Sequence, residues 1–179
     1  MQSGSHEAIG FDPADRPAFL ATHRALAVCA REVARLVEAV RQGAVALTAH
    51  SAADKLDVRL APDRCVVQLG PVALTVAWLR STLDTAERGE LLVIVWRGNV
   101  ARRGAYREPE RQLTSARTAT ATWEKTYVAA ATDEATWRWL AAPELETGYS
   151  SDELAAQCVT RLRDEYDACR SALPGSAIA

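Results

Sequence analysis

Long apolar segments are missing from this chain of 179 residues. No apolar run approaches the ~18–20 residues that a membrane-spanning helix needs. The polar start Met1–His6 has neither the basic nor the apolar region of a signal peptide. The four cysteines form no Cys-x-x-Cys motif and have no metal-ligand spacing. We therefore expect a cytoplasmic protein with free thiols and no metal site.

Lysine is almost absent, because Lys55 and Lys125 are the only lysines among 21 basic residues. The preference for arginine, together with many alanines, indicates a GC-rich and hence bacterial genome. The net charge of −2 gives no whole-protein argument for binding nucleic acid or an anionic membrane. Hydrophobic and charged contents of 49% and 25% are ordinary for globular proteins, so we expect a folded chain.

Signatures of catalysis and of cofactor binding are also missing. The chain has no Gly-x-Ser-x-Gly elbow, no Walker or Rossmann glycine pattern, no His-Glu-x-x-His and no calcium-loop spacing. Of its three histidines, only His50 lies in a local His/Ser/Asp cluster, beside Ser51 and Asp54, and polar loops often contain such clusters. We predict no catalytic residue and no cofactor, and we favour a non-enzymatic function.

Apolar periodicity predicts a helix near each end of the chain. Residues 12–17 provide a helix start, and apolar side chains then recur three, four or seven apart to about Gln42, with Gly43 as the expected stop. Ser150 and Glu153 form a capping box that opens a second helix, which should end near Ala172. The long first helix and the capped second helix therefore flank the middle of the sequence.

Between these helices, strand-length runs joined by short turns predict a mostly antiparallel meander of about six strands. The expected strands are 55–60, 65–69, 72–79, 91–96, 122–130 and 134–140. The sequence thus predicts a single α+β domain over 12–174, with flexible segments at 1–11 and 175–179. The order helix, antiparallel strands, helix loosely resembles that of small secretion chaperones, a resemblance of element order with no shared motif.

The two central strand runs, 72–79 and 91–96, are apolar at nearly every position, so both faces of the sheet centre need cover. If each helix covers one face, the protein is a self-contained monomer, and Ile94→Asp should unfold it. If both helices share one face, an apolar floor is left for a homodimer, a partner or a ligand, and Ile94→Asp should give a folded, dissociated chain. That floor would consist of Ala73, Thr75, Ala77, Leu92, Ile94 and Trp96, if the two strands are in phase.

Five tryptophans all fall on predicted strands. For Trp78 and Trp96 we favour core packing, with walls of a ligand cavity as the alternative. The second hairpin intersperses tryptophans with charged residues, so we expect it to lie at an edge and to be partly exposed. The predicted interaction or ligand surface consists of Ile94, Trp96, Trp123, Tyr127, Trp137 and Trp139.

The segment 97–117 contains six arginines, two glutamates and few apolar groups. Three interpretations remain open: a solvated loop, a contact with the acidic segment 133–167 or with a partner, and a site for nucleic acid or phosphate. The basic residues of this loop, besides Arg97, are Arg102, Arg103, Arg107, Arg111 and Arg117.

These observations favour a protein-interaction module, acting as an adaptor, a chaperone-like protein or a regulatory partner. We expect it to be a homodimer that uses the apolar sheet face and the tryptophan-rich hairpin. The first alternative is a binder of small apolar ligands with a tryptophan-lined cavity. The further alternative is nucleic-acid or phosphate binding through the loop 97–117, for which the net charge gives no support.

Overall fold

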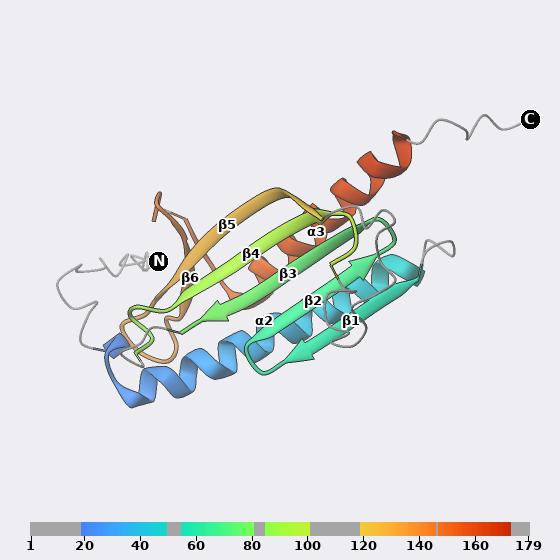
Figure 1. Cartoon of the computed structure of the whole chain (residues 1–179). Coiled ribbons are helices and arrows are strands. Elements are labelled where there is room, and N and C mark those ends of the chain that lie inside the picture. Colours follow the sequence, from blue (N-terminus) through green and yellow to red (C-terminus); the bar gives the residue numbers. More distant parts are fainter. Residues whose placement is uncertain (1–18, 50–54, 81–84, 101–118, 146, 173–179) are drawn as a thin grey trace, which may run out of the picture.

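The computed structural model describes residues 19–49, 55–80, 85–100, 119–145 and 147–172 (Figure 1). In this part of the chain a long helix precedes an antiparallel meander of seven strands, and a second helix follows it. The elements are α2 (His23–Ala49), β1 (Leu56–Ala61), β2 (Arg64–Leu69), β3 (Val72–Leu79), β4 (Glu90–Arg97), β5 (Thr120–Ala130), β6 (Arg138–Ala142), β7 (Gly148–Tyr149) and α3 (Ser151–Ser171).

The predicted α+β meander between two helices is confirmed. The sheet has one strand more than expected, because the two-residue β7 pairs with β6. The last long strand begins later than expected, at Arg138, because residues 131–137 form the turn that follows β5. The predicted flexible segments 1–11 and 175–179 lie outside the described residues.

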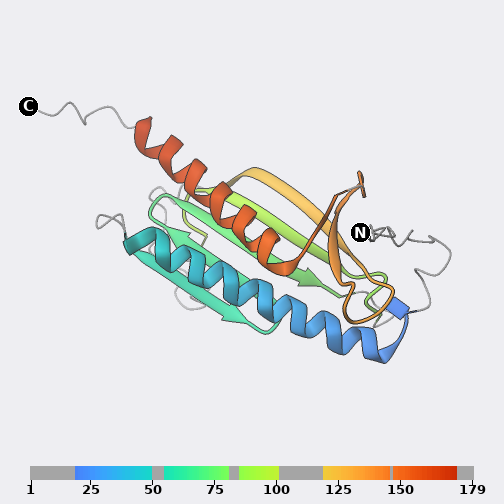
Figure 2. The same ribbon diagram turned by 180° about the vertical axis from the view of Figure 1, so that it is seen from behind.

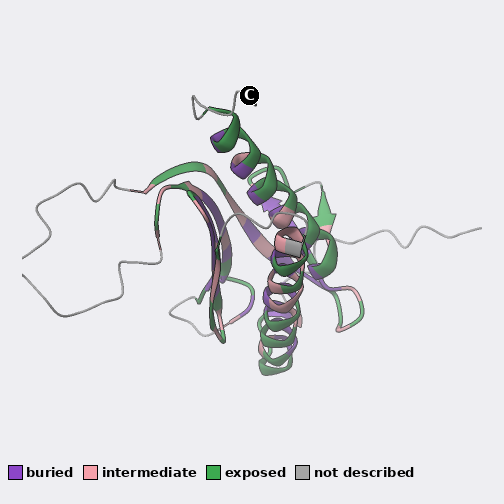
Figure 3. Cartoon of the chain, turned by 90° about the vertical axis from the view of Figure 1, so that its right-hand side faces the viewer, coloured by how far each residue is buried: buried purple, intermediate pink, exposed green. Residues whose placement is uncertain are grey.

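Both helices lie on the same face of the sheet. Figure 2 shows α2 and α3 side by side in front of the strands, and Figure 3 shows the sheet edge-on with both helices on one side. We call the side that carries the helices the inner face and the opposite side the outer face. Of the two arrangements open at the sequence level, the structure therefore has the second. No described helix is long and apolar enough to cross a membrane.

Helix α2 is capped by Thr22, whose Oγ1 accepts a hydrogen bond from the backbone N–H of Ala25 at 3.1 Å. The expected stop at Gly43 is wrong, because the helix continues to Ala49. A Cβ added at Gly43 would lie 2.7 Å from Cγ2 of Val159, so the glycine allows α3 to approach closely. The expected helix start at 12–17 lies outside the described residues.

The capping box of α3 is confirmed. The backbone N–H of Ser150 donates to Oε2 of Glu153 at 2.8 Å, and the N–H of Glu153 donates to Oγ of Ser150 at 3.3 Å. Along the contact between the helices, residue numbers rise on both α2 and α3, from Glu32 with Ser151 to Gly43 with Val159. The two helices therefore run in the same direction across the inner face (Figure 2).

The core lies between the inner face and the two helices. Alternate residues of β2, β3 and β4 point into it, and the apolar stripes of α2 and α3 meet them. Its largest fully buried aliphatic side chains include Leu36, Leu74, Leu91, Leu154 and Leu162. Burial of each contributes roughly 1.5–3 kcal/mol to the free energy of unfolding, so this single core accounts for most of the stability.

All four cysteines are free and buried. Burial raises the pKa of the Cys29 and Cys158 thiols to about 12 and that of Cys65 to about 11. These thiols are therefore protonated, unreactive packing groups in the folded chain at neutral pH.

Candidate functional site

The outer face carries a two-strand apolar floor at its centre. The register of β3 and β4 places three small side chains of β3 directly beside three large side chains of β4. These pairs are Ala73 with Trp96, Thr75 with Ile94, and Ala77 with Leu92. The strand phase assumed from the sequence is therefore confirmed. Neither helix covers this floor, because both lie on the inner face (Figure 3).

The floor is close-packed but remains open to solvent in part. Ile94 is 8% exposed, and Thr75, Leu92 and Trp96 are half-buried. The Trp96 indole leans across the strands, and its Nε1 donates to Oγ1 of Thr75 at 3.0 Å. The sequence favoured a core position for Trp96, and the structure shows that this prediction is wrong. Instead, Trp96 presents a flat, polar-anchored ring on the outer face.

Gln68 closes one end of the floor. This side chain of β2 is buried, and its Nε2 donates to the carbonyls of Gly70 and Val72, each at 2.9 Å, and of Gly98 at 3.2 Å. Its Oε1 accepts from the backbone N–H of Val100 at 3.0 Å. The amide thus ties the β2–β3 turn to the chain that leaves β4, and it fixes the backbone around Trp96.

Charged side chains of opposite sign border the two sides of the floor. On the side of β1 and β2, Arg59 and Arg64 are exposed on the outer face, and Nε of Arg59 lies 3.4 Å from Oδ2 of Asp57. On the other side, Glu124 of β5 lies beside Ile94 in the register, and it is exposed. Arg59 and Arg64 thus border the floor on the side of β1 and β2, where Asp57 offsets part of their charge, and Glu124 borders it on the side of β5.

The tryptophan-rich hairpin does not form an exposed surface. Trp139, Trp137 and Tyr127 are 0%, 4% and 2% exposed, respectively, and they lie on the inner face beneath the helices. The prediction of an exposed hairpin is therefore wrong for these three residues, and only Trp123 is half-buried. The alternation of the strands sends Glu124 to the outer face instead.

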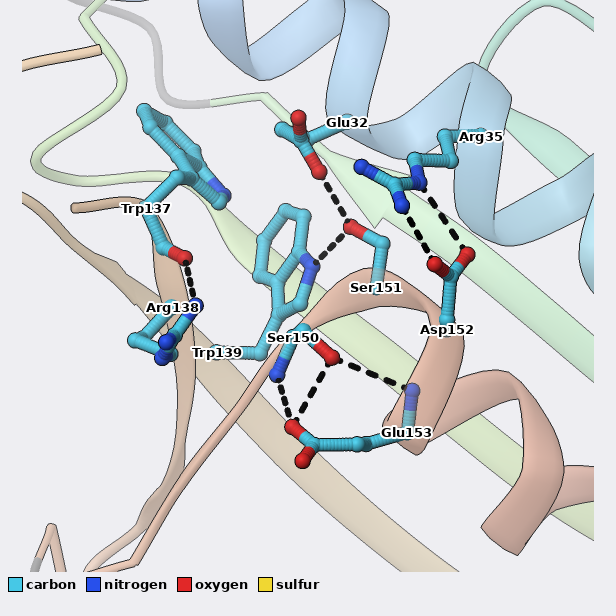
Figure 4. A network of polar contacts seen from close by, with 9 residues as sticks. All are labelled: Glu32, Arg35, Trp137, Arg138, Trp139, Ser150, Ser151, Asp152 and Glu153. Atoms are coloured by element: carbon cyan, nitrogen blue, oxygen red, sulfur yellow. Dashed lines mark hydrogen bonds and ion pairs between the residues drawn. The ribbon is translucent and has the colours of Figure 1, made fainter. Parts of the chain in front are cut away.

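A polar network secures this hairpin to both helices (Figure 4). Nε1 of Trp139 donates to Oγ of Ser151 at 3.0 Å, and this hydroxyl donates to Oε2 of Glu32 at 2.6 Å. Beside it, Nε of Arg35 donates to Oδ1 of Asp152 at 3.0 Å. The arrangement joins α2, α3 and β6 at one point. Because Ser151 is buried, the network is structural and offers no accessible nucleophile.

The acidic segment 133–167 is matched by arginines of other elements. Besides Arg35 with Asp152, Glu134 forms ion pairs with Arg24 and with Arg31, and the hydrogen bond from Arg24 lowers the pKa of Glu134. Arg97 at the end of β4 donates from Nε to Oε1 of Glu165 at 2.8 Å. The predicted contact between segment 97–117 and the acidic segment is thus seen for Arg97.

Residues 101–117 of the basic loop lie outside the described residues, so the solvated, protein-binding and nucleic-acid interpretations of the loop remain predictions. The loop residues concerned are Arg102, Arg103, Arg107, Arg111 and Arg117. His50 also lies outside the described residues, and His23 is exposed at the start of α2. Among the described side chains, no three His, Cys, Asp or Glu residues are grouped as metal ligands.

Two of the cavities on the helix side of the sheet have walls that include tryptophan and charged side chains. The first, of about 460 Å³, lies between α2, the β1–β2 turn and the end of β3. Trp78, Leu26 and Val33 form its apolar walls, and the polar side chains of Asp63, Arg80 and Thr85 complete its lining. Trp78 is 7% exposed and belongs to the core, as favoured from the sequence, and its ring also lines this cavity, whereas Trp96 lies on the opposite face of the sheet.

The second cavity, of about 590 Å³, lies between α3 and the inner face of β5 and β7, and we call it the aromatic cleft. Trp123, Lys125 and Tyr127 contribute from β5, Tyr149 contributes from β7, and Arg161 contributes from α3. Sequence reasoning named Trp123 and Tyr127, but it missed Tyr149 and Arg161. Their proximity depends on how α3 packs on the sheet, which no local pattern encodes.

Comparison with known proteins gives no relative from which a function can be transferred. No protein-family model matches the chain, and no match was found among curated proteins or solved structures.

Proposed function

We propose that the protein is a non-enzymatic interaction module whose outer sheet face pairs with a second copy of the same chain. The observation that carries this proposal is the row of large side chains on β4 beside the row of small side chains on β3. A twofold axis that runs along the strands, between β3 and β4, lays each row over the other row of the partner. Two sheets then pack face to face, as in aligned sheet packing.

The register makes this pairing specific. Under such an axis, Leu92 faces the partner's Ala77 and Ile94 faces the partner's Thr75. The large side chains of β4 therefore pack against the small side chains of the partner's β3 on both sides of the axis. Thr75, Leu92 and Trp96 are half-buried and leave part of the floor open to water, and monomers rarely leave a contiguous apolar patch open. Burial of the two floors therefore supplies the driving force for association.

The borders of the floor support the same axis. The rotation brings β2 of one copy over β5 of the other, so that Arg64 lies over the partner's Thr126 and diagonal to the partner's Glu124, two residues away along β5. The contact occurs twice by symmetry. A twofold axis across the strands would instead place each edge over its own copy, with like charges together.

A charge-reversal cycle tests the pairing. Arg64→Glu and Glu124→Arg each replace two attractions by two repulsions, so each variant alone should raise the dimer Kd about 10–100-fold. An equimolar mixture of the two variants should restore the dimer, because the heterodimer again has opposite charges at both contacts. Sedimentation equilibrium or light scattering after size exclusion measures the masses.

The matched control is Arg163→Glu, the same charge change at an exposed position of α3 on the helix side. It should leave the dimer Kd unchanged. A single-chain mass for the unsubstituted protein at high micromolar concentration contradicts the proposal. If neither charge reversal changes the dimer Kd, the outer-face pairing is contradicted and the dimer uses another surface.

The cavity beside Trp78 supports a second candidate function, the binding of a small apolar ligand. Its volume of about 460 Å³ falls in the range of ordinary ligand sites, and its lining is mostly apolar. Ala30 lines it and is exposed, so a larger side chain at this position can enter the cavity without disturbing the core.

We expect Ala30→Leu to lower the affinity for the neutral dye phenylnaphthylamine about tenfold by filling this cavity. Dye fluorescence and quenching of tryptophan emission both report the binding. Ala168→Leu, at an exposed position of α3, is the matched control and should have no effect. Equal dye binding in both variants excludes the Trp78 cavity as the site.

A further inference from the structure

Lys125 is a charged residue on the otherwise mostly apolar inner face of the sheet. Its neighbours on the same side of β5 are Trp123 and Tyr127, and its cross-strand partner is the buried Val93. The inner-facing residues of β3 and the corresponding residues 91, 93 and 95 of β4 are all buried and apolar. An ammonium group at such a position is costly unless it reaches water or a counter-charge. The aromatic cleft gives it that access, because Lys125 lies on the cleft wall and is half-buried.

The wall of the cleft is unusually rich in aromatic rings. Trp123, Tyr127 and Tyr149 line it, and the last two rings pack edge to face with centroids 6.2 Å apart. Across from them, the exposed flank of α3 from Ala156 to Asp164 spans about 12 Å. This length suits a small molecule rather than a polymer.

A second cation lines the same cleft. The guanidinium carbon of Arg161 lies 5.7 Å from the Trp123 ring centroid, and Arg161 forms no ion pair with any residue that the structure describes. Trp123 and Lys125 are two residues apart on one face of β5, and both Lys125 and Arg161 line the cleft. Arg161 therefore keeps its guanidinium donors for a ligand while its face stacks on the indole.

The acidic groups near the cleft do not neutralise this pair. Nζ of Lys125 lies 3.5 Å from Oε2 of Glu144, whose side chain is 74% exposed, and such surface pairs contribute little. Asp164 also lines the cleft, one turn after Arg161, and its side chain is exposed. A ligand anion can therefore replace Glu144 beside Lys125 at little cost.

We propose that the aromatic cleft binds a small molecule that carries an anionic group on an aromatic ring. The ring stacks among Trp123 and Tyr149, and the carboxylate, sulfonate or phosphate accepts charge-assisted hydrogen bonds from Lys125 and Arg161. The cleft lies on the inner face, so this site is independent of pairing through the outer face.

Two dyes that share an aromatic framework test the proposal. Anilinonaphthalene sulfonate carries the anion, and phenylnaphthylamine lacks it. Anilinonaphthalene sulfonate should bind with a Kd at least about tenfold lower than that of phenylnaphthylamine, which lacks the anion. Lys125→Met and Arg161→Gln should each raise the Kd of the sulfonate about tenfold. Phenylnaphthylamine binding should be unchanged in both variants. Arg163→Gln removes a cation from α3 outside the cleft lining, and it should alter neither dye.

Energy transfer gives a second readout that does not depend on the charge variants. Transfer from tryptophan to the bound sulfonate should fall in Trp123→Phe, while circular dichroism confirms that the variant is folded. Sulfonate binding that survives both Lys125→Met and Arg161→Gln overturns the proposal. So does a parallel loss of both dyes, which would indicate a general apolar surface instead of an anion site.

Discussion

Ile94→Asp is expected to convert the protein from a dimer into a folded monomer with the mass of one 19.4 kDa chain. Ile94 lies at the middle of the outer floor, and under the proposed axis it faces the partner's Thr75. Ile94 is 8% exposed, so a carboxylate there has limited access to water in the monomer, and in the dimer it loses that access without gaining a partner. An unpaired buried charge costs about 3–5 kcal/mol, and symmetry doubles it, so the dimer Kd should rise at least about a thousandfold.

Glu124 complicates this substitution, because it lies directly beside residue 94 in the register. Two carboxylates on neighbouring strands repel each other, which lowers the stability of the monomer. Ile94→Lys avoids this cost, since the ammonium group pairs with Glu124 on the same face. Both variants should be monomeric, and the lysine variant should unfold at a higher urea concentration than the aspartate variant.

Light scattering and urea unfolding followed by circular dichroism provide the two measurements. An exposed position away from the outer face, Ala168→Asp on α3, serves as the control and should remain dimeric. A dimer that persists in Ile94→Lys shows that the floor is not the seam. Cooperative unfolding of that variant as a monomer supports the arrangement in which both helices share the inner face.

The sheet could be predicted largely from the sequence because strand periodicity is local. The ends of an apolar run such as 72–79 predict the ends of the strand, and short turns require the neighbouring strands to be antiparallel. The phase of β3 against β4 was an assumption at the sequence level, and the register of the two strands confirms it, so the composition of the floor agrees with the one expected. What the sequence left open was the side on which α3 packs, since an amphipathic helix fits either face of an apolar sheet.

Gly43 and the tryptophan hairpin show why the rest could not be predicted. A glycine after an apolar stripe is typical of a helix end, yet here it accommodates Val159 of α3. Charges between Trp123 and Trp139 favoured an exposed hairpin, but Glu124 and Arg138 both point to the outer face. The first error came from a contact between elements distant in sequence, and the second came from strand alternation, which sends the charged residues to the face opposite the helices.

Between pH 8 and pH 10 the free energy of unfolding is expected to fall by about 4 kcal/mol, a loss caused mainly by three buried thiols. Burial raises the pKa of Cys29 and Cys158 to about 12 and that of Cys65 to about 11, whereas an unprotected thiol titrates near pH 9.0. Above pH 9 the unfolded chain therefore loses protons that the folded chain retains. Stability is complete below that pH and declines as pH rises toward the folded-state values.

At pH 10 the titration of each such thiol favours the unfolded chain by roughly 1–2 kcal/mol, and the three together account for the loss. Arginines supply all but two of the basic charges and stay protonated in this range, so their ion pairs do not contribute. The raised pKa of buried Tyr127 acts in the same direction but begins later, near pH 10.

Urea unfolding under reducing conditions at several pH values measures this loss, and cysteine variants assign it. Cys29→Ala, Cys65→Ala and Cys158→Ala should each reduce the fall between pH 8 and pH 10 by about a third, whatever they do to stability at pH 7. Only the slope with pH is diagnostic, because filling or emptying space in the core changes stability at every pH alike. A flat profile up to pH 10 would mean that water reaches these thiols, and hence that α2 and α3 do not seal the inner face as tightly as the structure places them.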